Sequence, residues 1–208
     1  MGKTLLILAP HTDDGEIGCG ATVARLIEEG WRAIYIAFSA AEESVPDGFP
    51  KDILRKEVKL ATATLGIKEE DCITLQFKVR YFPRDRQEIL EEMIKIKRLY
   101  NPDLVFLPCR QDNHQDHKVI SEEGYRAFKN ITILGYEAPW NTVAFNGNTY
   151  YKVTDLHLKK KVQALECYKS QYGRSYVNEE FIKSWAITRG AEIGNKYAEV
   201  FEFIKNIK

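Results

Sequence analysis

The fold of this chain is decided by the stretch TLLILAPHTDDGEIGCG, residues 4–20. Its first six residues, Thr4 to Ala9, are almost uniformly apolar and stop at Pro10, which is typical of a strand buried on both faces of a parallel sheet. An imidazole and two adjacent carboxylates, His11, Asp13 and Asp14, follow this strand at once. Because ligands bind at the carboxyl ends of the strands in open α/β sheets, we expect these side chains to face a ligand site.

A second cluster of the same kind, DNHQDH, occupies residues 112–117. It follows another short apolar run, residues 104–107, which ends at Pro108, so three of the four histidines come directly after predicted core strands. Helix capping accounts for aspartate in such loops, and a lone histidine is more often structural than a ligand, but capping has no need for imidazoles. Imidazole and carboxylate are the ligands of catalytic zinc, which lowers the pKa of its water to about 7 and polarises a carbonyl. The pattern therefore predicts metal-assisted hydrolysis.

The chain resembles the PIG-L/LmbE family of zinc-dependent N-deacetylases. The specific part of the resemblance is carried by Pro10-His11-x-Asp13-Asp14 with Gly18-Cys19-Gly20-Ala21-Thr22, and by His114-x-Asp116-His117. Weaker similarity continues to Tyr197-Ala198-Glu199-x-Phe201, near the end of the chain. The chain departs from the common family text at Thr12 and Gln115, where proline is usual or frequent, and at Ala21, where glycine is usual. None of these three positions supplies a ligand.

The resemblance implies that His11, Asp14 and His117 bind one Zn²⁺. Asp13 is then the general base, because a residue adjacent to a ligand points away from the same metal and is free to take a proton from water. We expect His114, in its protonated form, to hold the developing oxyanion and to release the amine.

Three further residues have roles that the sequence leaves open. Asp116 is predicted either to orient His114 by a hydrogen bond or to be a solvent-exposed charge at the start of a helix. The resemblance places Arg55 and Tyr197 near the substrate, although an ordinary exposed arginine would fit Arg55 equally well. Trp140 is predicted to lie in the core or at a rim, where it could face a sugar ring.

Composition limits the class of protein and its partners. The 208 residues are 44% hydrophobic, which fits one domain over residues 1–208. Thirty basic and thirty acidic residues balance, which gives no reason to expect nucleic acid or an anionic membrane as partner. No run approaches the roughly 18 apolar residues of a membrane span. The cysteines have no paired spacing, so we expect free thiols and a cytoplasmic protein; a homo-oligomer stays open.

Periodicity predicts an α/β fold, a Rossmann-like and mostly parallel sheet with helices on both faces and a C-terminal antiparallel extension. Residues 39–50 lack periodicity and are expected to form a loop over the crevice. Asn146-Gly147 predicts a hairpin of two antiparallel strands within residues 142–153. The expected strands are residues 4–9, 33–38, 73–77, 104–107, 131–136 and 198–204, and the expected helices are residues 21–29, 55–65, 86–100, 116–128, 156–168 and 179–188.

The function best supported by these residues is removal of an N-acetyl group from an N-acetylglucosamine-type amino sugar, a substrate class implied by the resemblance alone. A nucleotide-binding protein without hydrolytic activity is the alternative, with residues 15–20 as a glycine-rich turn and Glu42 and Glu43 near the ribose. The glycine order there is Gly-x-x-Gly-x-Gly, unlike that of dinucleotide folds, which also have no use for two histidine clusters. A family member that keeps zinc only for binding is a third alternative, against which Asp13 and His114 argue.

Overall fold

One seven-stranded sheet, in the order β3-β2-β1-β4-β5-β7-β6, organises the computed structural model, which describes residues 2–207. The first five strands in this order are parallel, and β7 and β6 extend the sheet as antiparallel strands beyond β5. The predicted fold class is thereby confirmed. The strands are β1 (Thr4–Ala9), β2 (Arg32–Ala37), β3 (Cys72–Thr74), β4 (Leu104–Pro108), β5 (Thr132–Tyr136), β6 (Thr149–Lys152) and β7 (Ala198–Lys205).

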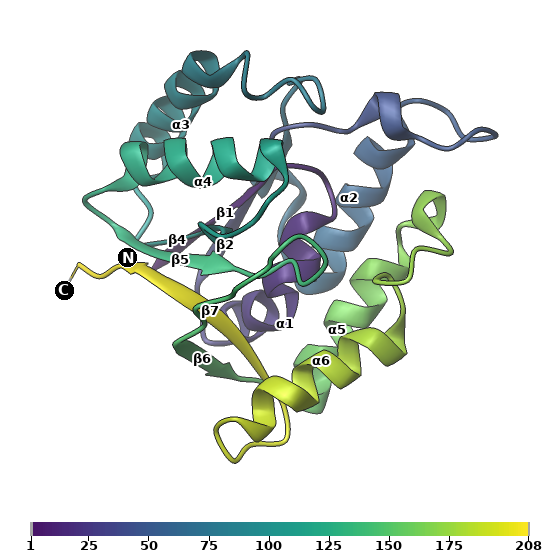
Figure 1. Cartoon of the computed structure of the whole chain (residues 1–208), viewed down its shortest axis with the longest axis vertical. Coiled ribbons are helices and arrows are strands. Elements are labelled where there is room, and N and C mark those ends of the chain that lie inside the picture. The colour runs from purple at the N-terminus through teal and green to yellow at the C-terminus, as the bar shows by residue number, and fades with distance from the viewer. Residues whose placement is uncertain (1, 208) are drawn as a thin grey trace.

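Helices cover both faces of the sheet (Figure 1). The two faces of β1 show why, since Leu5 and Ile7 pack into one apolar cluster while Leu6 and Leu8 pack into another. One face carries α1 (Asp14–Glu28), α2 (Ile53–Leu65), α5 (Asp155–Glu166) and α6 (Glu179–Ala191), and the other carries α3 (Arg86–Tyr100) and α4 (Gln115–Phe128).

The connections around β1 create the crevice that positions the site. From β1 the chain crosses by α1 to β2 on one side, whereas β4 pairs with β1 on the other side. The loops that leave β1 and β4 therefore diverge at the carboxyl ends of two neighbouring strands. This is the topological switch point at which open α/β sheets bind ligands.

The first helix begins seven residues earlier than the sequence predicts, at Asp14 rather than Ala21. Glycine disfavours helix, which is why residues 15–20 are predicted as a turn. Here the glycines permit close packing instead: a Cβ at Gly15 would lie 2.6 Å from the Tyr35 ring, and one at Gly18 would collide with the Tyr136 ring. The glycine-rich turn proposed for nucleotide binding therefore does not exist in this chain.

The predicted hairpin around Asn146-Gly147 is also wrong. Among the described residues only Thr149–Lys152 of this region forms a strand, and its partner is β7. Residues 143–148 form a loop whose end lies beside β7, where the Asn148 N–H donates to the Phe201 carbonyl and the Asn148 side-chain oxygen accepts from the Phe203 N–H. Beyond Thr74 the backbone continues beside β2 by single hydrogen bonds, so β3 is shorter than predicted.

Two further expectations bear on the chain as a whole. All four cysteines are free thiols, as predicted. Within residues 2–207 no helix combines the length and the apolar character needed to cross a membrane.

Candidate metal centre and active site

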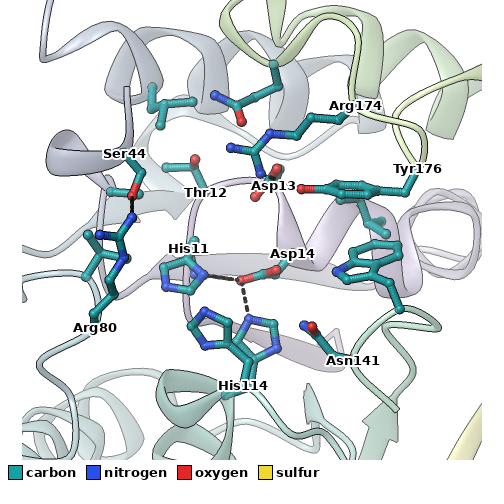
Figure 2. A pocket seen from close by; sticks show the side chains of 17 residues that line it. His11, Thr12, Asp13, Asp14, Ser44, Arg80, His114, Asn141, Arg174 and Tyr176 are labelled. Carbon is teal, nitrogen blue, oxygen red and sulfur yellow. Dashed lines mark hydrogen bonds and ion pairs between the residues drawn. The ribbon is translucent and has the colours of Figure 1, made fainter. Parts of the chain in front are cut away.

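Two loops at the switch point bring the predicted site residues together. His11 and Asp13 follow β1, and Asp14 is the first residue of α1. His114 follows β4 as the N-cap of α4, and His117 lies in the first turn of that helix. Figure 2 shows how the side chains of both loops converge in one cavity of about 350 Å³.

The three residues predicted to bind metal present their donor atoms to one another. Oδ2 of Asp14 lies 3.1 Å from Nδ1 of His11 and 3.3 Å from Nε2 of His117, and the two dashed lines that meet at Asp14 in Figure 2 mark these contacts. One donor atom from each residue lies within 4.8 Å of the other two. Two imidazoles and one carboxylate in this arrangement are the ligand set of a three-ligand catalytic metal centre.

Each of the two histidines, His11 and His117, contacts a further carboxylate through the ring nitrogen that faces away from Asp14. Nε2 of His11 lies 3.0 Å from Oδ2 of Asp116, and Nδ1 of His117 lies 2.8 Å from Oδ2 of Asp112. Such carboxylates fix the tautomer and the ring orientation of a metal ligand. The donor chemistry therefore fits a divalent metal ion.

The charges around the two histidines are those of a cation site. Burial lowers the pKa of His11, but the charge of Asp14 and the hydrogen bond that the ring donates to Asp116 outweigh it and raise that pKa to about 9. Burial also lowers the pKa of His117, but the charge of Asp14 and the hydrogen bond to Asp112 outweigh it and raise that pKa to about 10. Three carboxylates thus surround two imidazoles, so without a metal this site retains protons.

Asp13 lies beside the metal ligands, and its pKa is raised. Burial is the main cause and the charge of Asp14 adds to it, while the charges of Arg174 and His11 act in the opposite direction. Figure 2 shows the Arg174 guanidinium next to Asp13, with Tyr176 alongside. Arg174 in turn donates a hydrogen bond to the Tyr176 hydroxyl. A carboxylate of raised pKa next to a metal site is suited to take up a proton at neutral pH.

His114 is not protonated in the way that the sequence suggests. The carboxylate of the expected partner, Asp116, contacts His11 instead. The backbone N–H of Asp116 donates a hydrogen bond to Nδ1 of His114 over 3.2 Å. Nδ1 is therefore an acceptor, and the ring proton sits on Nε2. Burial, then the charges of His117 and His11, lower the pKa of His114. His114 is thus a neutral hydrogen-bond donor, and Asp116 is buried rather than solvent-exposed.

Arg55 and Tyr197 do not line the cavity. Arg55 pairs with Glu42, with 2.8 Å between Nε and Oε1, and its guanidinium also reaches the carbonyl oxygen of Leu75. Tyr197 is 8% exposed and packs in the apolar cluster between α1, α5 and α6. The sequence-based expectation that these two residues contact substrate is not supported by their positions, because each side chain is engaged in holding elements together.

An aromatic wall closes one side of the cavity. The Trp140 and Tyr176 rings stack with centroids 3.9 Å apart and an interplanar angle of 16°. Both residues line the cavity, together with Arg174. Trp140 remains 41% exposed, which is the rim position that the sequence allowed for it.

Sequence reasoning missed three residues that shape the site. Asp112 stands in the second cluster of the sequence. Its contact with His117, five residues later, depends on the fact that α4 begins between the two residues. Arg80 lies in a left-handed conformation with φ of 71°, uncommon for a side-chain-bearing residue, and its N–H donates to Oδ2 of Asp116 over 2.7 Å. Neither Arg80 nor Arg174 stands in a recognisable motif, so no local signal pointed to them.

The switch-point location, the three-ligand donor set and the adjacent carboxylate define a class, the metal-dependent hydrolases built on a Rossmann-like sheet. The chain belongs to the PIG-L family, since the family model described as GlcNAc-PI de-N-acetylase matches residues 6–128. The chain is accordingly an N-deacetylase.

Known relatives agree with this assignment. Diacetylchitobiose deacetylase of Thermococcus kodakarensis is 24% identical, over 99% of this chain and 84% of the relative. The uncharacterized deacetylase YaiS of Escherichia coli is 31% identical, over 81% of this chain and 91% of the relative. Among solved structures, N,N'-diacetylchitobiose deacetylase from Pyrococcus horikoshii superposes with a TM-score of 0.82 at 24% identity, covering 97% of this chain and 84% of that one.

Proposed function

We propose that this chain is a zinc-dependent deacetylase that hydrolyses the acetamido group of an N-acetylglucosamine-type amino sugar or its conjugate. The observation that carries the proposal is the convergence of His11, Asp14 and His117 beside Asp13 in one cavity. The names of the relatives favour an amino-sugar substrate. A cavity of about 350 Å³ is at the small end of the range for ligand pockets, which suits a sugar ring with its acetamido group.

His11, Asp14 and His117 would hold the zinc ion, which when bound lowers the pKa of water and polarises the substrate carbonyl. Asp13 takes the proton of the attacking water as the new C–O bond forms at the acetyl carbon. The same carboxyl then gives that proton to the leaving nitrogen as the C–N bond breaks. Acetic acid and a free amine result, and at neutral pH the proton of the acid passes to the amine, so the products are acetate and an ammonium group and no second catalytic acid is needed.

His114 has a different part in this scheme. Its Nδ1 accepts the helix N–H of Asp116, so Nε2 carries a proton that can be donated to the oxygen of the tetrahedral intermediate. A neutral imidazole at a helix N-terminus is a known arrangement for polarising a carbonyl. The aromatic wall of Trp140 and Tyr176 lines the same cavity and offers a sugar ring an apolar surface to pack against.

The proposal is tested by metal analysis of the purified protein, followed by acetate release from N-acetylglucosamine, diacetylchitobiose and their conjugates. We expect about one zinc per chain and acetate release that a chelator abolishes and zinc restores. Asp14→Ala is the matched variant and should lose both metal and activity. If Asp14→Ala binds metal as tightly as the parent, the ligand set is wrong; if the metal-loaded parent releases no acetate from any amino sugar, the substrate class is wrong.

A further inference from the structure

A buried cluster of three polar side chains lies directly beneath the active-site loop. Glu16 comes from the first turn of α1, Tyr35 from β2 and Tyr168 from the turn after α5. Glu16 is fully buried, and the two tyrosines are each 1% exposed. The two tyrosine hydroxyls meet at the backbone carbonyl of Thr12, the residue between His11 and Asp13, and Glu16 bonds both hydroxyls from the other side. None of the three lines the cavity.

The contacts form a closed ring of hydrogen bonds. The Tyr168 hydroxyl lies 2.6 Å from the Thr12 carbonyl oxygen and 2.8 Å from Oε1 of Glu16. The Tyr35 hydroxyl lies 2.8 Å from the same carbonyl oxygen and also bonds Oε2 of Glu16. The Tyr35 oxygen in addition accepts the Gly15 N–H over 3.1 Å. Each hydroxyl has one proton, so at any moment it donates either to the Thr12 carbonyl oxygen or to Glu16.

The start of α1 is shaped to admit this ring. A Cβ at position 15 would lie 2.6 Å from the Tyr35 ring and 2.8 Å from its hydroxyl oxygen, so only glycine lets Tyr35 approach the turn. Glu16 closes the ring because its two oxygens reach the two tyrosines at once. The side-chain hydrogen bonds of Glu16 within residues 2–207 are those with the two tyrosine hydroxyl groups.

We propose that Glu16, Tyr35 and Tyr168 are positioning residues that clamp the Thr12 carbonyl and thereby set the directions of the Asp13 carboxyl and the His11 imidazole. The inference rests on the deacetylase function proposed above. The Thr12 carbonyl belongs to the peptide that joins Thr12 to Asp13, and the preceding peptide joins Thr12 to His11. A rotation at Thr12 therefore changes the directions of both side chains. A misplacement of about 1 Å in an active site can cost on the order of 10²-fold in rate.

The experiment removes single hydroxyls without changing ring volume. Tyr35→Phe, Tyr168→Phe and the double variant are compared with Tyr136→Phe, a matched control. Tyr136 is also 1% exposed, and its hydroxyl donates to the Leu8 carbonyl, outside the ring. We expect the two single variants and the double variant of Tyr35 and Tyr168 to keep one metal per chain and an unchanged KM. Their kcat should fall about 10-fold in the single variants and on the order of 10²-fold in the double variant. Tyr136→Phe should keep the parental kcat.

A second readout does not depend on turnover. Cobalt replaces zinc in such ligand sets, and its visible absorption reports the ligand geometry. We expect the cobalt spectrum to change in Tyr35→Phe and Tyr168→Phe and to match the parent in Tyr136→Phe. This arm separates the two ideas, because an inactive parent with a changed spectrum in the ring variants would contradict the deacetylase function and support the clamp.

Substitution of Glu16 completes the test. A glutamine can accept from one tyrosine and donate to the other, so Glu16→Gln should retain most of the parental kcat and spectrum, whereas Glu16→Met should behave like the double tyrosine variant. A folded double variant with parental kcat and spectrum would overturn the proposal. So would an equal loss of kcat in Tyr136→Phe, since the effect would then belong to any buried hydroxyl. If Glu16→Met does not fold, the single Tyr→Phe variants still decide whether the clamp exists.

Discussion

Asp13 is the residue on which the proposed chemistry depends most directly. Replacing it with asparagine removes the proton acceptor but keeps the shape and the neighbouring ligands. We expect Asp13→Asn to retain zinc and to lose turnover by roughly 10²- to 10⁴-fold, the usual range for a general base. Metal analysis and acetate release on the same sample measure both effects. Full turnover with metal bound would exclude Asp13 from the reaction.

Arg174 sets the pH at which Asp13 works. Burial and Asp14 raise the pKa of Asp13, and the Arg174 charge counteracts this rise. A base must be ionised, so activity is lost as pH falls through that raised pKa. We predict that Arg174→Met moves the acidic limb of the kcat/KM profile toward higher pH, because a partner that lowers the pKa is gone. As a control, Arg80→Asn removes a charge from the same cavity and should leave the acidic limb at the parental pH. An acidic limb at the parental pH in Arg174→Met as well would contradict an effect of Arg174 on the pKa of Asp13.

Asp112 holds the outer nitrogen of His117 and should matter to metal affinity rather than to proton transfer. We expect Asp112→Asn to weaken zinc binding about 10- to 100-fold, the usual effect of losing such a carboxylate. Competition with a chromogenic chelator measures the affinity. Asp71→Asn is the control, since Asp71 is a buried carboxylate that pairs with Arg32 away from the site. Equal affinities for zinc in the Asp112→Asn variant and the parent would remove Asp112 from the metal centre.

At the scale of elements, α1 is where packing overrides helix propensity. Gly18→Ala should destabilise the fold by about 1–3 kcal/mol, because the new Cβ would collide with the Tyr136 ring. In the same helix, the atom nearest to a Cβ at Gly20 is Cγ of Lys161, at 3.2 Å, which is far less severe than the collision at Gly18, and Gly20→Ala gains helix propensity. We therefore expect it to be neutral or stabilising. Urea unfolding of both variants gives the comparison, and equal stabilities would show that close packing does not explain the glycines.

The elements that the sequence could predict are those whose signals are local. Apolar runs located β1 and β4, and the residues placed directly after them reach the metal centre. The start of α1 could not be predicted, because the need for Gly15 and Gly18 comes from Tyr35 and Tyr136 on other strands. The hairpin failed for a similar reason, since the partner of β6 lies far along the chain in β7.

The histidine and aspartate motifs pointed to residues that the fold brings together in one cavity, but not to the pairings between those residues. Which carboxylate meets which imidazole nitrogen depends on the angle between the loop after β1 and the first turn of α4. Asp116 was therefore matched with His114, although it contacts His11, 105 residues away. Arg174 reaches Asp13 only through the tertiary packing of the turn after α5.

For the whole molecule, a metal ion held by the proposed ligands would join two loops that leave adjacent strands, so it should stabilise the entire fold. A ligand present at about 100 times its Kd contributes about 2.7 kcal/mol. For a domain of this size that corresponds to a rise in Tm of roughly 5–11 °C. Calorimetry with zinc and with chelator measures this difference. Asp14→Ala should show no zinc-dependent rise, and an equal rise in that variant would place the stabilising ion elsewhere.

The division of the ligands between the two loops also has a consequence for the making of the protein. A nascent chain that has left the ribosome only as far as β4 carries His11 and Asp14 but lacks His117. It therefore holds an incomplete set of donors and competes poorly for scarce zinc. Once α4 has emerged and docked beside β1, the set is complete and the ion can be captured. With the ligand set proposed above, zinc uptake would mark chains whose central strands are already paired, and chains truncated before α4 would lack the third ligand.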